Sequence, residues 1–362
     1  MVGGGILGSL HAFEAIRRGH EVVHLERGKV PQGASVRNFG LCWVSGRRPG
    51  AELQLALTAR QRWEELGSAI PGLGFRPNGS LTLATNTAEL KVLELAAGRD
   101  DAADRQFQLL EEDEAKALNP GLTSRFLGAL WCPLDAAVEP RLALGAIRSH
   151  LEASGRYKFI PERSIVDVDD HVVIDHLGAR HEGDLVLLAP GAADGDPLHA
   201  LLAAPDLQRV RLQMLETEPL PRALRTSVAD GNSLRYYPAF AEFSHLLPEQ
   251  DPELRRYGIQ LLCQQRLDGA LTLGDTHAYD EPFSFDLDER STELVLDLAR
   301  AAIGDPLPKV ARRWAGIYHQ LRQVTDDRLY YRRTVAPGVL HVDGAGGRGM
   351  TLAPAIAQES FE

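Results

Sequence analysis

The chain has 362 residues, which is more than one small core needs and indicates two structural bodies. Its composition is ordinary for a soluble globular protein, with 44% apolar and 25% charged residues. The net charge of −11 argues against a nucleic-acid groove, and the lack of a long apolar stretch argues against a membrane span. Because Met1 to Gly8 lacks the charged start and apolar core of a signal peptide, we expect a cytoplasmic protein.

Three cysteines, Cys42, Cys132 and Cys263, lie far apart in the sequence. Their odd number argues against a disulfide framework, and their spacing matches no metal site, so we expect no metal. Each cysteine is expected to be a reduced, buried, small apolar residue.

The chain opens with a glycine-rich turn at residues 3–8 (GGGILG). A helix is predicted over Ile6–Arg18, followed by a short strand over Glu21–Leu25. Only two residues precede the turn, whereas a dinucleotide fold normally opens with a full buried strand. The first strand of this β-turn-α-β unit is therefore expected either to be a stump or to continue upstream of the given sequence.

Further helices are predicted from apolar periodicity and from Pro, Asn or Gly at their ends. They cover Leu53–Leu66, Glu111–Leu118, Pro140–Ser154, Thr292–Ile303 and a last helix that starts near Thr351. Strands are predicted where short apolar or alternating runs lie between turn residues. They fall within Phe75–Ala84, a hairpin of Ser164–Val168 and His171–Asp175, Asp184–Ala189, Arg209–Thr217, Ser233–Tyr237, Tyr257–Gln265, Ala270–Leu273, Val310–Tyr318 and Gly338–Val342.

This order of elements predicts an α/β fold with two domains. A Rossmann-like dinucleotide-binding domain is expected to be assembled from the separated segments 1–45, 138–207 and 310–362. A second, β-rich substrate domain is expected from 46–137 and 208–309.

The glycine turn and an acidic residue after it predict a dinucleotide site. Gly3 permits the tight turn, Gly5 lets a pyrophosphate approach the backbone, and Gly8 lets the helix pack closely on the strand. Glu26 stands at the end of the next strand, 18 residues after Gly8. A carboxylate at that place accepts both hydroxyls of an adenosine ribose.

Two further loops fit the same cofactor. Residues 33–40 (GASVRNFG) mix small side chains with Ser, Arg and Asn, which suits a loop that crosses a pyrophosphate. Residues 344–351 (GAGGRGMT) carry four glycines before the last helix, so backbone amides can approach a flat ring system. The helix start supplies a partial positive charge that stabilises electrons on the N1–C2=O edge of a flavin, which favours a flavin over a nicotinamide.

On these residues the chain resembles the D-amino acid oxidase class of flavoenzymes, which includes glycine oxidase and sarcosine oxidase. The resemblance covers nearly the whole chain. It rests on GGGILG, Glu26, GASVRNFG, the strand DLVLLAPGA, and Trp314-Ala315-Gly316 followed by GGRGMTLAP. SVRNFG, LGDTH (273–277) and GMTLAP are also similar to a subgroup often proposed to serve aminophosphonate breakdown.

The resemblance implies an FAD-binding domain of the D-amino acid oxidase (GR2) type. It implies oxidation of the C–N bond of a small amine, with a hydride passing to flavin N5 and with oxygen or another acceptor taking the electrons. The cofactor contacts are then expected from Gly3, Gly5, Ile6, Leu7, Gly8, Glu26, Arg27, Ala34, Ser35, Arg37, Asn38, Val166, Ala189, Gly191, Gly347, Arg348, Gly349, Met350 and Thr351.

One position departs from the family pattern. Members similar to glycine oxidase carry an arginine shortly after the Trp-Ala-Gly stretch, where it clasps the substrate carboxylate, and this chain has Tyr318 there. A hydroxyl in place of a guanidinium fork argues against an ordinary α-amino acid as the substrate. Any acidic group on the substrate then needs another cation, and Arg348 or Arg235 is expected to supply it.

The remaining polar candidates are weighed against ordinary structural roles. We expect His277, Tyr318 and Arg348 to act on the substrate and Trp43, Arg235 and Tyr236 to bind it. The alternatives are that His277 is a solvated loop histidine, that Arg235 and Tyr236 belong to a surface strand, and that Trp43 is a core residue. Two other functions stay open, namely a 2-hydroxy acid dehydrogenase of the same fold and a non-catalytic binding protein.

Overall fold

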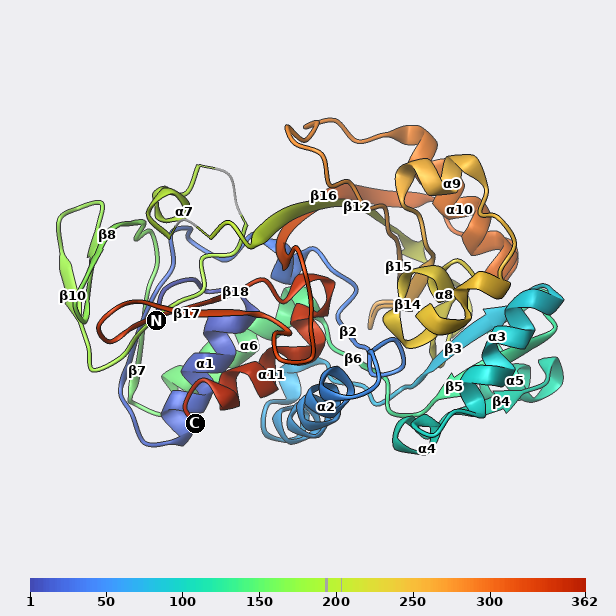
Figure 1. Ribbon diagram of the computed structural model, residues 1–362, viewed down its shortest axis with the longest axis horizontal. Helices are drawn as coiled ribbons and strands as arrows, with labels where there is room; N and C mark the ends of the chain where they lie inside the picture. The colour runs from blue at the N-terminus through green and yellow to red at the C-terminus, as the bar shows by residue number, and fades with distance from the viewer. Residues whose placement is uncertain (193–194, 203) are drawn as a thin grey trace.

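The computed structural model describes residues 1–192, 195–202 and 204–362, so residues 193, 194 and 203 of the predicted 138–207 segment lie outside the described part. The molecule is elongated, with two bodies side by side (Figure 1). Two long antiparallel strands, β12 (Leu207–Pro219) and β16 (Val310–Leu321), run from one body into the other.

The first body is built on a parallel sheet. Its strands are β7 (Tyr157–Ile160), β1 (Val22–Leu25), β11 (Val186–Leu188) and β18 (Val339–Asp343), with β17 (Tyr331–Ala336) antiparallel at the edge. Val2 bridges both Leu25 and Leu188 in parallel, and its amide donates to the carbonyl of Leu187 at 2.8 Å. One residue therefore takes the central place that a dinucleotide fold gives to its first strand.

Four helices pack together against this sheet. They are α1 (Ile6–Arg17), α2 (Ala51–Ala69), α6 (Pro140–Glu152) and α11 (Gly349–Glu359). Although α2 falls in the predicted substrate segment 46–137, it packs on α11, and Trp63 of α2 donates its Nε1–H to the carbonyl of Met350 at 3.0 Å.

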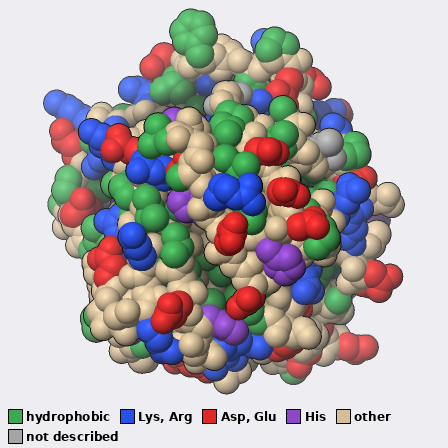
Figure 2. All heavy atoms as spheres, turned by 90° about the vertical axis from the view of Figure 1, so that its left-hand side faces the viewer, with side chains coloured by type: hydrophobic (Ala, Val, Ile, Leu, Met, Phe, Trp, Pro, Cys, Tyr) green, Lys and Arg blue, Asp and Glu red, His purple; other side chains and the backbone are tan. Residues whose placement is uncertain are grey.

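A small sheet forms the far end of this body. It consists of β8 (Ile165–Asp169), β9 (Val172–Asp175) and β10 (Arg180–Glu182), and it contains the predicted hairpin. Figure 2 looks onto this end of the molecule, where acidic and basic side chains are interspersed.

The second body contains an eight-stranded sheet in the order β16-β12-β15-β14-β13-β3-β5-β4. Neighbouring residues of β5 point to opposite faces of this sheet. Ala129 belongs to the hydrophobic core that contains α10, and Leu130 belongs to the core that contains α3. The other strands are β3 (Ser80–Ala84), β4 (Gln108–Leu110), β5 (Gly128–Cys132), β13 (Ser227–Ala229), β14 (Leu262–Gln265) and β15 (Ala270–Gly274). Its helices are α3 (Thr87–Ala97), α4 (Ala102–Arg105), α5 (Glu112–Leu118), α8 (Ser233–Tyr236), α9 (Pro252–Tyr257) and α10 (Glu289–Ile303).

Two strands and one α-helix of the described residues remain, and all three are short. The pair β2 (Leu41–Cys42) and β6 (Ala136–Ala137) joins the two bodies, and α7 (Pro197–Leu202) lies in the first. All three cysteines are unpaired and buried, as expected. In the part of the chain that the structure describes, no helix is long and apolar enough to cross a membrane.

The predicted strand over Ser233–Tyr237 is wrong. Residues 233–236 form the short helix α8, which continues a turn at Asp230 whose carbonyl accepts from both the amide and the hydroxyl of Ser233. The predicted strand over Tyr257–Gln265 begins only at Leu262, since the Asp251 side chain caps α9 and Tyr257 ends that helix. The other predicted helices and strands are present within a few residues of their predicted bounds.

Candidate active site

A continuous cleft runs from the glycine turn to the second body. It consists of two adjoining cavities of about 650 Å³ and about 450 Å³. Both cavities are lined by Ile6, Ala34, Ser35, Arg37, Tyr318, Gly346 and Gly349. The cleft therefore joins the glycine turn, the 33–40 loop and the last glycine loop, which are far apart in the sequence.

The glycine turn is packed too tightly for side chains. Gly3 has a φ of +95°, and a Cβ on it would lie 2.1 Å from the carbonyl oxygen of Ala189. A Cβ on Gly8 would lie 2.0 Å from the carbonyl oxygen of Gly3. Neither position has room for a side chain, so the turn at Gly3 is tight and α1 packs closely at Gly8, as the sequence predicts.

The 33–40 loop crosses the start of α1. Ser35 Oγ accepts a hydrogen bond from the amide of Ile6 at 2.9 Å, and a Cβ on Gly5 would lie 3.1 Å from the same oxygen. Asn38 holds the loop in shape, because its Nδ2 donates to the carbonyl of Ala34 at 2.8 Å. Arg37 Nη1 donates to the carbonyl of Ala315 on β16 at 2.8 Å, which ties the loop to the long strands.

Glu26 lines the first cavity and its carboxylate is hydrogen-bonded to the glycine turn. Its Oε2 accepts from the amide of Gly4 at 2.7 Å and its Oε1 accepts from the amide of Gly28 at 2.9 Å. Each carboxylate oxygen has a second lone pair, so Glu26 keeps capacity for the two hydroxyls of a ribose.

Most other predicted cofactor residues also line the cleft. Leu7, Arg27, Ala189 and Gly191 line the first cavity, whereas Gly347, Arg348, Met350 and Thr351 line the second. Val166 is not among the lining residues. It lies exposed on β8, and the nearby Ser164 lines the first cavity instead.

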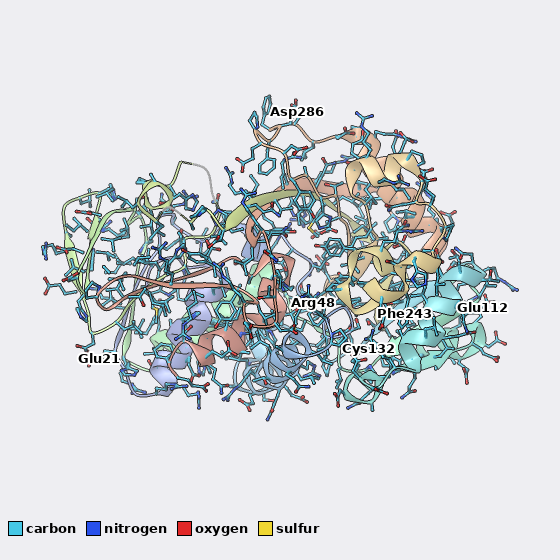
Figure 3. All side chains as sticks on the ribbon, viewed as in Figure 1. Glu21, Arg48, Glu112, Cys132, Phe243 and Asp286 are labelled. Atoms are coloured by element: carbon cyan, nitrogen blue, oxygen red, sulfur yellow. The ribbon has the colours of Figure 1, made fainter. Side chains whose placement is uncertain are left out.

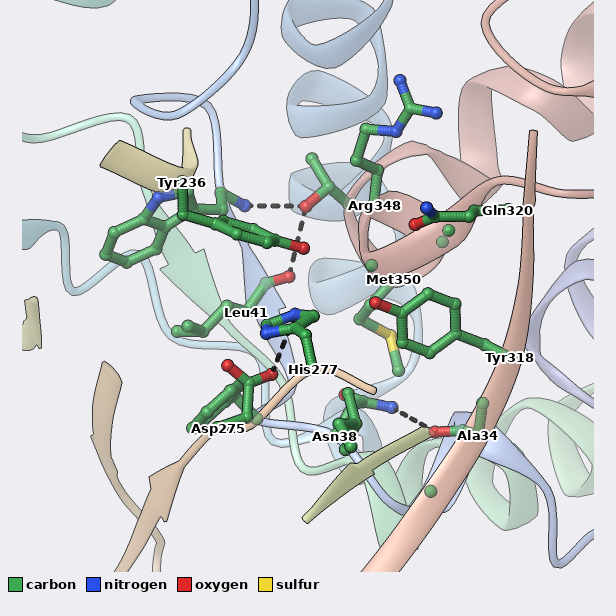
Figure 4. Close-up of a pocket in the computed structure, with 18 of the residues that line it drawn as sticks. Ala34, Asn38, Leu41, Tyr236, Asp275, His277, Tyr318, Gln320, Arg348 and Met350 are labelled. Carbon is green, nitrogen blue, oxygen red and sulfur yellow. Dashed lines mark hydrogen bonds and ion pairs between the residues drawn. The ribbon is translucent and has the colours of Figure 1, made fainter. Parts of the chain in front are cut away.

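Two tyrosines face each other across the second cavity (Figure 4). Tyr318 Oη is buried without a hydrogen-bond partner among the described residues. The ring centroids of Tyr236 and His277 lie 4.6 Å apart. Burial raises the pKa of both phenols, so each stays a neutral hydroxyl at pH 7. Both hydroxyls can therefore donate to, or accept from, a bound substrate.

His277 lies in this cavity and is buried rather than solvated. Its Nδ1 is 3.1 Å from the carbonyl oxygen of Gly258, and its Nε2 is 3.9 Å from Oδ2 of Asp275. Trp43 is both a core residue and part of the wall, since it is buried, lines the cavity and packs on Tyr237.

The arginines are arranged differently from the prediction. The structure does not bring Arg235 into the cavity, because its guanidinium donates to the carbonyl of Pro248. Arg348 lines the cavity, and its guanidinium turns away from the centre, 3.6 Å from Oε1 of Glu52 (Figure 4). Arg47 lies 3.5 Å from the same oxygen.

Sequence reasoning missed several residues of this wall, among them the charged residues Arg47, Arg48, Glu52 and Asp275. The paired arginines of GRRPG (46–50), three residues after Trp43, were the available signal for the first two. Arg48 lies near the middle of the molecule, between Glu21 at one end and Glu112 at the other (Figure 3).

The geometry of the cleft fits FAD. The start of α1 and the Glu26 carboxylate lie along the first cavity, where a pyrophosphate and a ribose would bind. In the second cavity, a Cβ on Gly347 would meet nothing nearer than 3.5 Å, so the glycine loop leaves room for a flat ring beside the start of α11.

Comparison with known proteins gives the same cofactor. Residues 1–361 match the model of a family described as FAD dependent oxidoreductase. A Rhizobium etli protein named as a thiamine biosynthesis oxidoreductase, ThiO, is 32% identical over 189 residues, which are 51% of this chain and 54% of that protein. The matches span about half the length of the curated relatives.

Solved structures share the fold at low sequence identity. The glycine oxidase of Geobacillus kaustophilus has a TM-score of 0.77 and 20% identity, over 99% of this chain and 91% of that chain. The iminodiacetate oxidase of Chelativorans sp. BNC1 has a TM-score of 0.77 and 19% identity, over 99% and 92%. From the family match, this chain belongs to the family of FAD dependent oxidoreductases.

Proposed function

We propose that the protein oxidises the C–N bond of a small amine. The observation that carries this proposal is the convergence of Tyr236, Tyr318 and His277 on the cavity beside the last glycine loop. Bound FAD would accept a hydride from the carbon that bears the nitrogen, and the imine would then hydrolyse. The names of two similar proteins, glycine oxidase and iminodiacetate oxidase, support an amine as the substrate.

The chain's own residues hold and orient the substrate. The two neutral phenols offer hydrogen bonds, and the His277 ring packs against Tyr236. The apolar wall of Trp43, Leu212 and Met214 excludes water from the reacting carbon. Oxygen or another acceptor would take the electrons after substrate oxidation.

The part of the cavity wall that would bind an acidic group of the substrate offers several separate donors, not one guanidinium fork for a carboxylate. Tyr318 stands where the resemblance to glycine oxidase implies an arginine, and Arg47, Arg48 and Arg348 line the wall instead. A phosphonate carries up to two charges and three acceptor oxygens, which suits several separate donors. We therefore propose an aminophosphonate, or an amine without a carboxylate such as an N-methyl amine, over glycine or D-alanine.

The two predicted domains remain part of this proposal, with one change. We assign the cofactor to the body of 1–45, 138–207 and 310–362, and the substrate walls to 46–137 and 208–309. Because α2 packs on α11, we place residues 51–69 with the cofactor body.

The test is anaerobic reduction of the holoenzyme. FAD-loaded protein is mixed with 2-aminoethylphosphonate, methylamine, glycine, D-alanine or lactate, and the loss of flavin absorption is followed. We expect bleaching by an amine, fastest with 2-aminoethylphosphonate or methylamine. Bleaching by lactate alone would support the 2-hydroxy acid dehydrogenase, and faster bleaching by glycine would overturn the substrate preference.

A further inference from the structure

Asp275 is a buried carboxylate that the proposed chemistry leaves without a role. It directly follows β15, is 5% exposed, and lines the second cavity. Its two side-chain contacts are long. Gln260 Nε2 lies 3.4 Å from Oδ1, and His277 Nε2 lies 3.9 Å from Oδ2, whereas normal N–H···O bonds are about 2.7–3.2 Å.

The surroundings of Asp275 offer no permanent cation. Among the described residues, its carboxylate forms no ion pair with a lysine or an arginine. Burial raises its pKa, and the partial offset comes from His277 and Gln260. The titratable groups that face it are His277, Tyr236, Tyr237, Tyr279 and Tyr318. A buried charge without a partner is costly, so this position favours a proton or a bound cation.

Two neighbouring side chains each offer an acceptor beside Asp275. His277 Nδ1 donates to the Gly258 carbonyl, so the neutral ring turns an unprotonated Nε2 toward Asp275. Gln260 Oε1 is buried without a hydrogen-bond partner and belongs to the same cavity wall. Three acceptors therefore meet at one place, and an ammonium group has three N–H donors.

The opposite side of the cavity has the opposite charge. Glu52 is flanked by two arginines, Arg47 and Arg348, so that cluster carries a net positive charge. Figure 4 shows Asp275 and Arg348 on opposite sides of the space between the two tyrosines. A substrate with an amino group at one end and an acid at the other matches this distribution of charge.

We propose that Asp275 binds the substrate ammonium and accepts a proton from it before oxidation. One N–H bond of the ammonium breaks and an O–H bond forms on Asp275, while the electron pair stays on the nitrogen. The products are a neutral amine and a neutral carboxylic acid, so charge and atoms balance. His277 Nε2 and Gln260 Oε1 are the two further acceptors for the ammonium group. This inference rests on the proposed amine oxidation and assigns its proton acceptor.

The test is Asp275→Asn, which removes the charge and keeps the shape. In the holoenzyme, kcat/KM for the fastest amine of the panel is measured from pH 6.5 to about pH 10, near the amine's own pKa. We expect a loss of about 10²-fold at pH 7. The loss should shrink by about tenfold per pH unit, because the free amine needs no proton acceptor. Asp275→Glu should restore part of the rate at pH 7.

The control is Asp280→Asn, which removes an exposed carboxylate five residues further along. FAD content and melting temperature are measured for each variant, and Asp275→Ser provides a second removal of the carboxylate if the Asn variant does not fold. A rate within twofold of wild type at pH 7, or a loss that is equal at every pH, would overturn the role of Asp275 alone. Reduction of the wild-type flavin by no amine would overturn the proposed function with it.

Discussion

The hydroxyl oxygens of Tyr236 and Tyr318 both lie close to Gly347. A Cβ on that glycine would lie 3.5 Å from the first oxygen and 3.7 Å from the second. The phenols come from α8 and β16 in the second body and the long strands, whereas the glycine belongs to the loop before α11. The cavity is therefore assembled at the junction of the two bodies, and Gly347 leaves space beside the two hydroxyls.

Gly347→Ala is expected to impair the cavity and spare the fold. The added methyl group makes ordinary contacts, so the melting temperature should change little, yet it occupies space between the phenols and the glycine loop. A misplaced methyl group in a binding pocket costs about 1–3 kcal/mol, so kcat/KM should fall by about tenfold or more. Gly145→Ala on α6, where a Cβ meets nothing within 4 Å, is the matched control. Unchanged kinetics in Gly347→Ala would remove the glycine loop from the site.

Glu26→Ala is expected to weaken FAD retention and the fold together. The carboxylate accepts from the amides of Gly4 and Gly28, and the buried amide of Gly4 costs about 1–3 kcal/mol when it is left without an acceptor. FAD affinity is measured by fluorescence titration and stability by thermal unfolding of the apoprotein. Glu21→Ala, at an exposed position, should alter neither quantity. Wild-type FAD affinity in Glu26→Ala would exclude this residue from ribose binding.

Tyr318→Phe is expected to raise KM more than it lowers kcat. The buried hydroxyl has no partner in the described residues, so its removal should cost little stability. The hydroxyl is expected to bind the substrate equally well in the ground state and in the transition state, so its loss should raise KM and change kcat little. Tyr331→Phe removes another buried hydroxyl without a partner, in a different core, and should leave both constants unchanged. Equal kinetics in the two variants would contradict the assignment of Tyr318 to the substrate.

Stability is expected to fall in weak acid because of two buried histidines. Burial lowers the pKa of His11 to about 4 and that of His24 to about 3. His24 accepts from the Tyr157 hydroxyl and donates to the Gly3 carbonyl, both at 2.9 Å, so it supports the glycine turn in its neutral form. Below the unfolded pKa of about 6.5 the unfolded chain binds protons that the folded chain does not, so stability decreases as pH falls.

The measurement for this prediction is the melting temperature as a function of pH. We expect a decrease of several degrees between pH 7 and about pH 5. Each kcal/mol of unfolding free energy shifts the melting temperature by about 2–4 °C in a domain of about 150–250 residues, and by less in a larger chain. His24→Gln should reduce the decrease, whereas His20→Gln at an exposed position should not. A melting temperature that stays flat down to pH 5 would contradict the neutral burial of these histidines.

Local patterns in the sequence predicted most of the scaffold. The glycine turn, the helix after it and Glu26 follow from residue types at fixed spacing, and the structure brings them together. The strand predicted at 233–237 failed because alternating apolar residues do not reveal the turn at Asp230, whose carbonyl accepts from both the amide and the hydroxyl of Ser233. A period-2 pattern over five residues is too short to decide against such a turn.

The walls of the cavity were harder to predict because they depend on distant contacts. Arg235 looked available in the sequence, but a carbonyl thirteen residues further along holds its guanidinium. Glu52 becomes part of the site only when α2 packs on α11 and brings it within 3.6 Å of Arg348. Asp275 and His277 become part of it only when the end of β15 lies beside Tyr236 of α8. No spacing rule within one segment encodes these pairs.

The central claim is that a hydride leaves the carbon that bears the substrate nitrogen, and a deuterium isotope effect tests it most directly. The fastest amine of the panel is prepared with deuterium on that carbon, and flavin reduction is followed by anaerobic rapid mixing against the unlabelled amine. We predict slower reduction with the deuterated amine, together with release of the carbonyl product of that carbon. Equal rates for the two amines, without a carbonyl product, would contradict the claim.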